Sequence, residues 1–405
     1  MTCEMMTRTK LFNYQLAAYE KLSKLKVGAL YMDMGVGKTR TMLEIIITKL
    51  KKRKVNHVLW LCPVSVKTTL NIDIKKHTDG VINYITIMGI ESLSQSDRTY
   101  LQALDLVREY DCMLVIDESH KVKNWQAKRT QRAITLASYC SYRYILTGTP
   151  ISRNEADLFS QWYILDKRIF GYRSYHNFSK NHLEYDEHGK IVNVLNVEHL
   201  TQKMNPYTYI IKKEDIAMDL KGKVYETVYF DLEKDQNKCY QETKKRLLTY
   251  IEESDEYDRN LIFKLFTALQ LISSGREVYE VENNKKVFHQ AMYKNPLYNP
   301  RIEMLKTLIE DETEKTIIWC KYQFEIEEVE KLIKHLNKSY VLLTGKITLE
   351  NREKNLVALR NDVQFLIANI GVGGTGLNLQ FINRAIYYSN GFDWGNRTQS
   401  EDRIY

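Results

Sequence analysis

The segment Leu30-Tyr-Met-Asp-Met-Gly-Val-Gly-Lys-Thr-Arg-Thr-Met-Leu43 decides the fold of this chain. The apolar run over residues 27–32 predicts a β-strand, and the apolar spacing over residues 38–49 predicts a helix. Between them, Gly35 and Gly37 let the backbone curl so that its N–H groups point inward. A strand, a glycine turn and a helix start in this order predict a phosphate-binding loop, because the N–H groups and the helix dipole both favour an anion.

Two side chains at the start of the helix add to this prediction. Lys38 would place a positive charge beside the β- and γ-phosphates of a nucleotide, and the Thr39 hydroxyl would bind Mg²⁺. The match to the strict nucleotide-loop pattern is partial, because that pattern has glycine where this chain has Met32. An ordinary strand-to-helix turn is the alternative, so the prediction depends on the motifs that follow.

The composition is that of a soluble globular protein. The 405 residues suffice for two or three domains, and 44% of them are hydrophobic and 27% charged. A net charge of +8 permits a nucleic-acid partner without establishing one. The six cysteines have neither metal-ligand nor redox spacing, which indicates free thiols in a reducing compartment. The sequence has no signal peptide and no apolar run of membrane-spanning length, so we expect a cytoplasmic protein.

Three further motifs in the first half of the chain each follow an apolar run that predicts a strand. These motifs are Pro63-Val-Ser-Val-Lys67, Asp117-Glu-Ser-His120 and Thr147-Gly-Thr-Pro150. Strands that alternate with helices predict a parallel sheet, in which ligands bind at the carboxyl ends of the strands. Together with the glycine turn, four motifs are therefore expected at one edge of one sheet. Their agreement is a stronger indication than any one of them.

The acidic motif and one glutamine suit nucleotide chemistry. Asp117 at a strand tip would hold Mg²⁺, and Glu118 would orient or deprotonate an attacking water molecule. Gln15 lies in a segment, residues 11–22, that predicts an amphipathic helix, and we expect it on the more polar side. Its amide can both donate to and accept from an adenine edge.

The order of these motifs resembles the first motor lobe of a superfamily 2 helicase-type ATPase. In detail, DMGVGKT, CPVSVKTTLNIDIKK and DESHKVKN resemble motifs of the Swi/Snf-type translocase branch. The second half of the chain extends the resemblance. Residues 212–216 and 223–230 resemble the segment that bridges the two lobes, residues 369–379 the glycine-rich fifth motif, and residues 392–405 the start of the final motif.

The resemblance implies an α/β fold with two RecA-like parallel-sheet lobes and a largely helical bridging region. We expect the first, ATP-binding lobe at residues 1–165, the bridging region at 166–300 and the second lobe at 301–405. The family pattern continues to a second arginine beyond Tyr405, so the C-terminal end is expected to be incomplete. The short bridging region fits a compact motor of the kind found in bacteria and phages.

The resemblance also implies ATP and Mg²⁺ as cofactors and assigns roles to residues that match by position. The nucleotide would be bound by Gln15, Gly35, Gly37, Lys38 and Thr39, and the metal by Thr39 and Asp117. Catalysis would involve Lys38, Asp117, Glu118 and, from the second lobe, Arg403. Coupling would involve His120, Thr147, Thr149 and Gln399. Nucleic acid would contact Pro63, Ser65, Lys67, Gly373, Gly374, Thr375 and Asn378.

The expected function is therefore that of a monomeric, ATP-dependent DNA translocase that moves along duplex rather than single-stranded DNA. A strand-separating helicase is one alternative, since it shares the motor motifs. A non-motor nucleic-acid-binding module with a vestigial ATP site is another. The end of the chain before the second arginine favours the vestigial site, whereas the intact Lys38, Asp117 and Glu118 argue against it.

Overall fold

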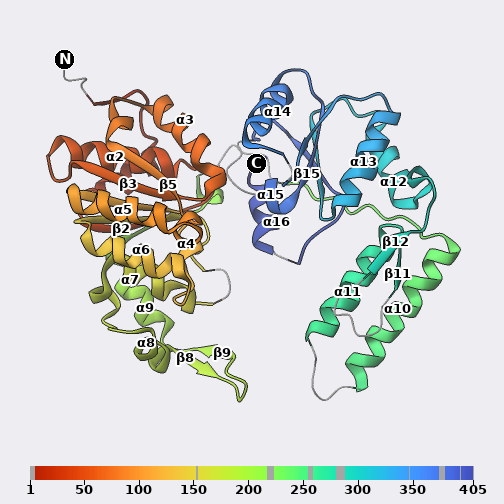
Figure 1. Ribbon diagram of the computed structural model, residues 1–405, viewed down its shortest axis with the longest axis horizontal. Helices are drawn as coiled ribbons and strands as arrows, with labels where there is room; N and C mark the ends of the chain where they lie inside the picture. Colours follow the sequence, from red (N-terminus) through yellow and green to blue (C-terminus); the bar gives the residue numbers. More distant parts are fainter. Residues whose placement is uncertain are drawn as a thin grey trace. The chain divides into compact units, whose positions relative to one another are not determined.

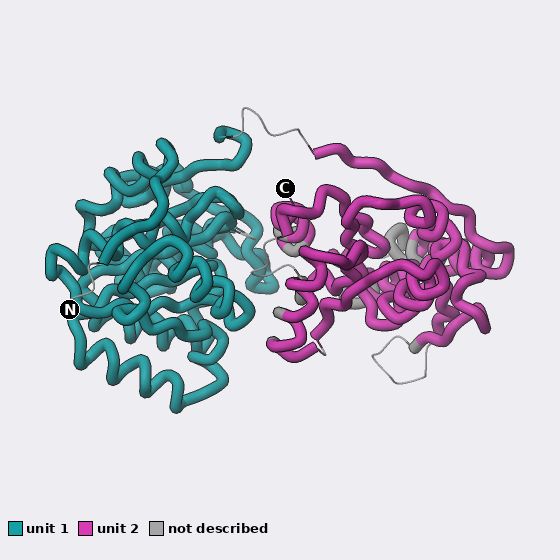
Figure 2. Tube along the Cα trace, turned by 90° about the horizontal axis from the view of Figure 1, so that it is seen from above, with its two compact units in different colours: residues 1–221, 375–377 teal, residues 222–374, 378–405 magenta. Residues whose placement is uncertain are grey.

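The computed structural model describes residues 5–151, 154–216, 223–253, 259–279, 288–345, 347–373, 379–392 and 394–404. The chain divides into two compact units, the first spanning residues 1–221 and the second beginning at residue 222 (Figure 2). The region assigned to the bridge, residues 166–300, is thus divided between the two units. Among the described residues, no helix combines the length and hydrophobicity needed to span a membrane.

The first unit is built around a parallel sheet (Figure 1). In the described part of the chain its strand order is β10-β2-β7-β6-β3-β5. Its strands are β2 (Val27–Met32), β3 (His57–Cys62), β5 (Ile85–Gly89), β6 (Cys112–Asp117), β7 (Tyr142–Thr147) and β10 (Thr208–Ile211). Its longer helices are α1 (Asn13–Leu22), α2 (Lys38–Lys51), α3 (Lys67–His77), α5 (Asp97–Glu109), α6 (Lys128–Tyr139) and α7 (Ala156–Phe170).

Both faces of this sheet are covered. Along β2, Ala29 and Tyr31 belong to one hydrophobic core, and Leu30 and Met32 belong to a second core on the opposite face. The first core also includes residues of α5, α6 and α7, and the second includes residues of α1, α2 and α3. A continuous apolar strand is what a doubly covered parallel sheet requires.

Smaller elements complete the first unit. Two short strands, β1 (Met6–Thr7) and β4 (Thr78–Asp79), pair antiparallel, and α4 (Ser92–Gln95) follows β5. After α7 come α8 (Tyr175–His182), the hairpin of β8 (Leu183–Tyr185) and β9 (Ile191–Val194), and α9 (Val197–Met204). The chain then returns to the sheet as β10, which pairs with β2 at the sheet edge.

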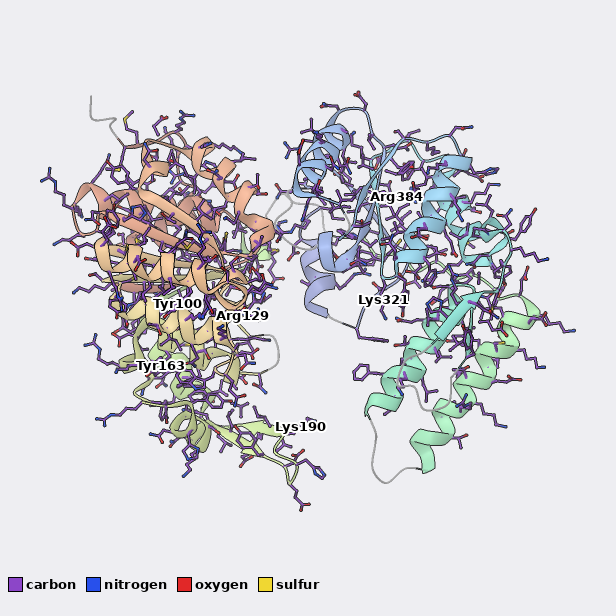
Figure 3. All side chains as sticks on the ribbon, viewed as in Figure 1. Tyr100, Arg129, Tyr163, Lys190, Lys321 and Arg384 are labelled. Atoms are coloured by element: carbon purple, nitrogen blue, oxygen red, sulfur yellow. The ribbon has the colours of Figure 1, made fainter. Side chains whose placement is uncertain are left out.

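The second unit has a parallel sheet with strand order β14-β15-β13-β16 among its described residues. These strands are β13 (Thr316–Cys320), β14 (Tyr340–Leu343), β15 (Phe365–Asn369) and β16 (Arg384–Tyr387). The accompanying helices are α12 (Pro300–Ile309), α13 (Gln323–His335), α14 (Leu349–Asn361), α15 (Ile370–Gly373) and α16 (Trp394–Glu401). Arg384 begins β16 and Lys321 follows the parallel strand β13, so the two residues lie at opposite ends of these strands (Figure 3).

Before the second sheet lies a helical pair, α10 (Lys234–Glu253) and α11 (Arg259–Ser273), side by side (Figure 1). The hairpin of β11 (Arg276–Tyr279) and β12 (Phe288–Ala291) follows it. The prediction of an α/β protein with two parallel-sheet lobes is confirmed. The buried free thiols are also found, at Cys62, Cys112, Cys140 and Cys320.

Candidate nucleotide-binding site

The glycine turn after β2 has the backbone that the sequence predicts. Gly35 and Gly37 have positive φ angles of 82° and 87°, which glycine adopts at little cost, and α2 begins directly after them. Space is limited as well, because a Cβ atom at Gly37 would lie 2.2 Å from Nε2 of Gln15. The backbone conformation therefore favours glycine at position 37, and any larger residue would also displace the Gln15 side chain.

The Lys38 ammonium lies across the start of this loop. Its Nζ donates to the carbonyl oxygen of Met32 at 2.7 Å and to that of Asp33 at 3.1 Å. The charge is thus held over the loop where phosphate oxygens can replace these carbonyl groups as its partners. Thr39 is the next residue of α2 and is half-buried, so its hydroxyl lies at the same helix start.

Asp33 fixes the loop to the edge of the sheet. Its backbone N–H donates to the carbonyl of Ile211, the last residue of β10, at 3.2 Å. Its Oδ2 accepts from the backbone N–H of Lys213 at 2.9 Å. This role of Asp33 is not predictable from local sequence, because Asp33 and its partners lie about 180 residues apart.

The prediction that Gln15 lies on the polar side of its helix is wrong, because the side chain is only 3% exposed. Its Oε1 accepts from the N–H of Phe12 at 3.0 Å, and its Nε2 donates to the carbonyl of Val36 at 3.1 Å. The amide is buried because it satisfies two backbone groups at once. It thereby joins the start of α1 to the phosphate loop, and its contact with adenine stays a prediction.

The predicted common edge is confirmed by the strand register. Thr147 lies opposite Tyr31, and Leu146 lies opposite Asp117. Cys62 ends the neighbouring strand β3 on the same side. Burial, with the nearby charge of Asp117, raises the pKa of Cys62 to about 12, so this thiol stays protonated and is no nucleophile at neutral pH.

The acidic motif leaves β6 in an unusual conformation. The backbone N–H of Glu118 donates to Oδ1 of Asp117 at 3.0 Å. Glu118 itself has a φ of 50° and a ψ of 54°, in the left-handed region. Such a backbone costs free energy for a residue with a Cβ atom and is often found where side chains must be aimed at a ligand. The turn places the two carboxylates in succession at the end of the strand.

Three of the predicted coupling residues lie together beside this motif. Nδ1 of His120 lies 3.4 Å from Oε2 of Glu118 and 3.4 Å from Oγ1 of Thr147. Thr147 Oγ1 in turn accepts from the backbone N–H of Thr149 at 3.1 Å. A chain of contacts therefore runs from the Glu118 carboxylate to the loop after β7.

Two residues predicted to bind Mg²⁺ lie at the edge of the sheet that carries the phosphate loop. In the described ranges, no group of three His, Cys, Asp or Glu side chains is placed to bind a metal ion. Mg²⁺ in nucleotide sites takes most of its ligands from phosphate and water and few from the protein. Thr39 and Asp117, both at the edge that carries the loop, are the residues that would contribute.

Among the described residues, three of the predicted nucleic-acid contacts lie in the first unit. Pro63 is buried, whereas Ser65 is half-buried in a short turn and Lys67 is exposed at the start of α3. Gly373 ends α15 in the second unit. Gly374, Thr375 and Asn378 lie outside the described residues, as does the side chain of Gln399 in α16.

Arg403 follows α16 in the second unit. Its carbonyl accepts from the backbone N–H of Leu379 at 3.2 Å. The sites predicted on the phosphate loop and the acidic motif belong to the first unit. The catalytic role of Arg403 therefore stays a prediction.

Comparison with known protein families decides the classification. The model of the SNF2-related domain matches residues 13–284, and that of the helicase conserved C-terminal domain matches residues 300–405. The chain belongs to the SNF2-related family. The predicted membership of the Swi/Snf-type branch of superfamily 2 ATPases is thus confirmed.

Relatives of this SNF2-related chain come from eukaryotes and bacteria. The chromatin structure-remodeling complex subunit snf21 of Schizosaccharomyces pombe is 21% identical over 98% of the chain and 36% of the relative. The uncharacterized ATP-dependent helicase MG018 of Mycoplasma genitalium is 23% identical over 72% of the chain and 27% of the relative. The chain thus spans 36% or less of the length of these relatives. A solved SWI2/SNF2 ATPase core from Sulfolobus solfataricus, in complex with dsDNA, is 23% identical, has a TM-score of 0.45, and covers 98% of this chain and 85% of its own.

Proposed function

We propose that this SNF2-related protein hydrolyses ATP and uses the reaction to move along duplex DNA. The observation that carries the proposal is the alignment of the phosphate loop, the acidic motif and the Thr147–Thr149 loop at one sheet edge. These are the parts that a phosphoryl-transfer site needs, since its catalysis consists mainly of positioning and charge stabilisation. The match of residues 300–405 to a helicase C-terminal domain supports a motor rather than a simple nucleotide-binding protein.

The predicted site residues of the first unit have distinct roles in the proposed hydrolysis. Gly35 and Gly37 would present N–H groups to the phosphates, and Lys38 would exchange the Met32 and Asp33 carbonyls for phosphate oxygens. Mg²⁺, when bound, neutralises charge on the phosphates. Glu118 would take a proton from water as the water oxygen attacks the γ-phosphorus and the bond to the β–γ bridging oxygen breaks.

The contacts of Glu118 support a coupling role for its neighbours. A change in the position of the Glu118 carboxylate would alter its contact with His120. His120 contacts Thr147, which bonds the Thr149 backbone, so the change would be passed on to that loop. We assign Arg403 and Gln399 of the second unit to the same reaction because they match the family pattern. Arginine contacts to a transferring phosphoryl group contribute large factors in rate.

We propose that the protein moves along duplex DNA and that its side chains and backbone contact the DNA phosphates. Lys67 and Ser65 would contact phosphates from the first unit, and Gly373, Gly374, Thr375 and Asn378 from the second. Contacts to phosphates carry no sequence information, which a motor that moves along any sequence requires. The net charge of +8 supports such a partner.

The deciding experiment measures phosphate release without nucleic acid and with single-stranded DNA, duplex DNA and RNA in turn. We expect the strongest stimulation by duplex DNA. Lys38→Ala should abolish turnover with little change in thermal stability, and Glu118→Gln should retain ATP without cleaving it. Displacement of a triplex-forming strand without separation of a duplex would distinguish the translocase from a helicase. ATP binding with no turnover under any condition would favour the vestigial site.

A further inference from the structure

A buried side-chain pair joins the acidic motif to helix α7. Ser119, which follows Glu118 directly, and Gln161, in the middle of α7, are both fully buried. The Ser119 hydroxyl donates to Oε1 of Gln161 at 2.6 Å. Polar groups at such depth are costly unless they are hydrogen-bonded, so this contact has a definite geometry.

The other end of the same amide reaches the loop after β7. Nε2 of Gln161 donates to the carbonyl oxygen of Pro150 at 2.8 Å and to that of Asp157 at 2.8 Å. One side chain therefore holds both the acidic motif and residues 147–150, with both of its N–H groups in use. Gln161 stands in the run Leu158-Phe-Ser-Gln-Trp-Tyr-Ile-Leu165, where an apolar residue would pack without needing partners.

The residues on either side of Gln161 also make hydrogen bonds, but neither of them joins the acidic motif to the loop after β7. The Ser160 hydroxyl donates to the carbonyl of Lys123, beyond the acidic motif, at 3.1 Å. Nε1 of Trp162 donates to the Tyr31 hydroxyl, on the strand that leads to the phosphate loop, at 2.9 Å, and both side chains are buried. Three consecutive side chains of α7 thus bond the strand before the phosphate loop, the acidic motif with its continuation, and the loop after β7.

The connection through Gln161 is made by shorter contacts than the connection through His120. The path from the acidic motif to residues 147–150 through His120 uses two contacts of 3.4 Å, near the limit of a hydrogen bond. The path through Ser119 and Gln161 uses contacts of 2.6 and 2.8 Å, and these two side chains are fully buried, where hydrogen bonds are stronger.

We propose that Gln161 is a positioning residue that makes the acidic motif and residues 147–150 move as one body. The state of the loop after β7 then sets the direction of the Glu118 carboxylate, through Ser119. The inference rests on the proposed function, to which it adds the residue that links hydrolysis to the loop.

The test uses the variants Ser119→Ala, Gln161→Met and the two combined. Each single change leaves a buried polar group of the Ser119–Gln161 pair unpaired and should lower the unfolding temperature. The double change removes both members of that pair and should restore part of the loss, since the Pro150 carbonyl still lacks its donor. Kinetically the double variant should stay impaired, with DNA-stimulated kcat reduced about 10-fold or more and KM for ATP within about 2-fold of wild type. Ser160→Ala removes a buried hydroxyl from the same helix and should leave DNA stimulation unchanged.

A second measurement does not depend on turnover. Hydrogen–deuterium exchange of the Thr149 amide should be faster in Ser119→Ala than in wild type, and unchanged in Ser160→Ala. Restored stability together with wild-type DNA stimulation in the double variant would overturn the proposal, as would an unchanged Thr149 amide. Absence of turnover in the wild type, with the exchange result as expected, would instead count against the proposed function.

Discussion

Gly37→Ala offers a test of the phosphate loop whose size follows from the structure. The left-handed backbone at position 37 costs a residue with a Cβ atom about 1–2 kcal/mol. A Cβ atom there would lie 2.2 Å from Nε2 of Gln15, so the glutamine side chain must move away. That movement breaks its bonds to Phe12 and Val36, each worth about 1 kcal/mol. Gly37→Ala should therefore lower the free energy of unfolding by about 3–4 kcal/mol in total.

The assay is urea denaturation of wild type, Gly37→Ala, Gln15→Ala and the double variant, with unfolding of residues 5–216 followed by hydrogen–deuterium exchange. In the Gln15→Ala background the new Cβ atom has no side chain to displace. Gly37→Ala should then lower the free energy of unfolding only by the cost of the left-handed backbone, about 1–2 kcal/mol. Gly189→Ala is the control for the backbone contribution alone, because Gly189 has a φ of 73° and open space around it. An equal cost of Gly37→Ala in both backgrounds would refute the reasoning.

Three further predictions concern stability and reactivity. Tyr31→Phe leaves the Trp162 N–H unpaired and should lower the unfolding free energy of the first unit by about 1–3 kcal/mol in urea denaturation. Burial raises the pKa of Glu328 from 4.5 to about 7, although the charge of Arg276 lowers it. The folded state then keeps a proton that the unfolded state loses, so the second unit should lose about 3 kcal/mol of stability as the pH rises from below 4.5 to above 7. Glu328→Gln, compared at pH 5 and 8, should remove this loss. Iodoacetamide should alkylate partly exposed Cys239 well before the four buried thiols, as peptide mass spectrometry would detect.

Much of the sheet architecture was predictable because its strands are continuous apolar runs. The strand at Val27–Met32 has the predicted bounds. Polar motifs directly after such runs fall at one sheet edge for geometric reasons, which made the common site predictable too. Local sequence suffices where a strand is buried on both faces.

The features that sequence reasoning missed depend on distant partners. The burial of Gln15 follows from the Val36 carbonyl, which only the folded loop brings near, whereas helical periodicity pointed to solvent. Gln161 was one polar residue in an apolar run, and its partners Ser119 and Pro150 lie on other elements. The edge strand β10 is four residues long and is defined by pairing with a strand about 180 residues earlier.

The strand β10 has a mechanical consequence. The chain passes from β10 through Lys213, both bonded to Asp33, shortly before the first unit ends. A pulling force on the chain beyond residue 216 would therefore load the base of the phosphate loop before the inner strands of the sheet. A ligand that stabilises the phosphate loop would make it harder to separate β10 from β2. By reciprocity, tension on the chain would weaken binding of that ligand by the same free energy.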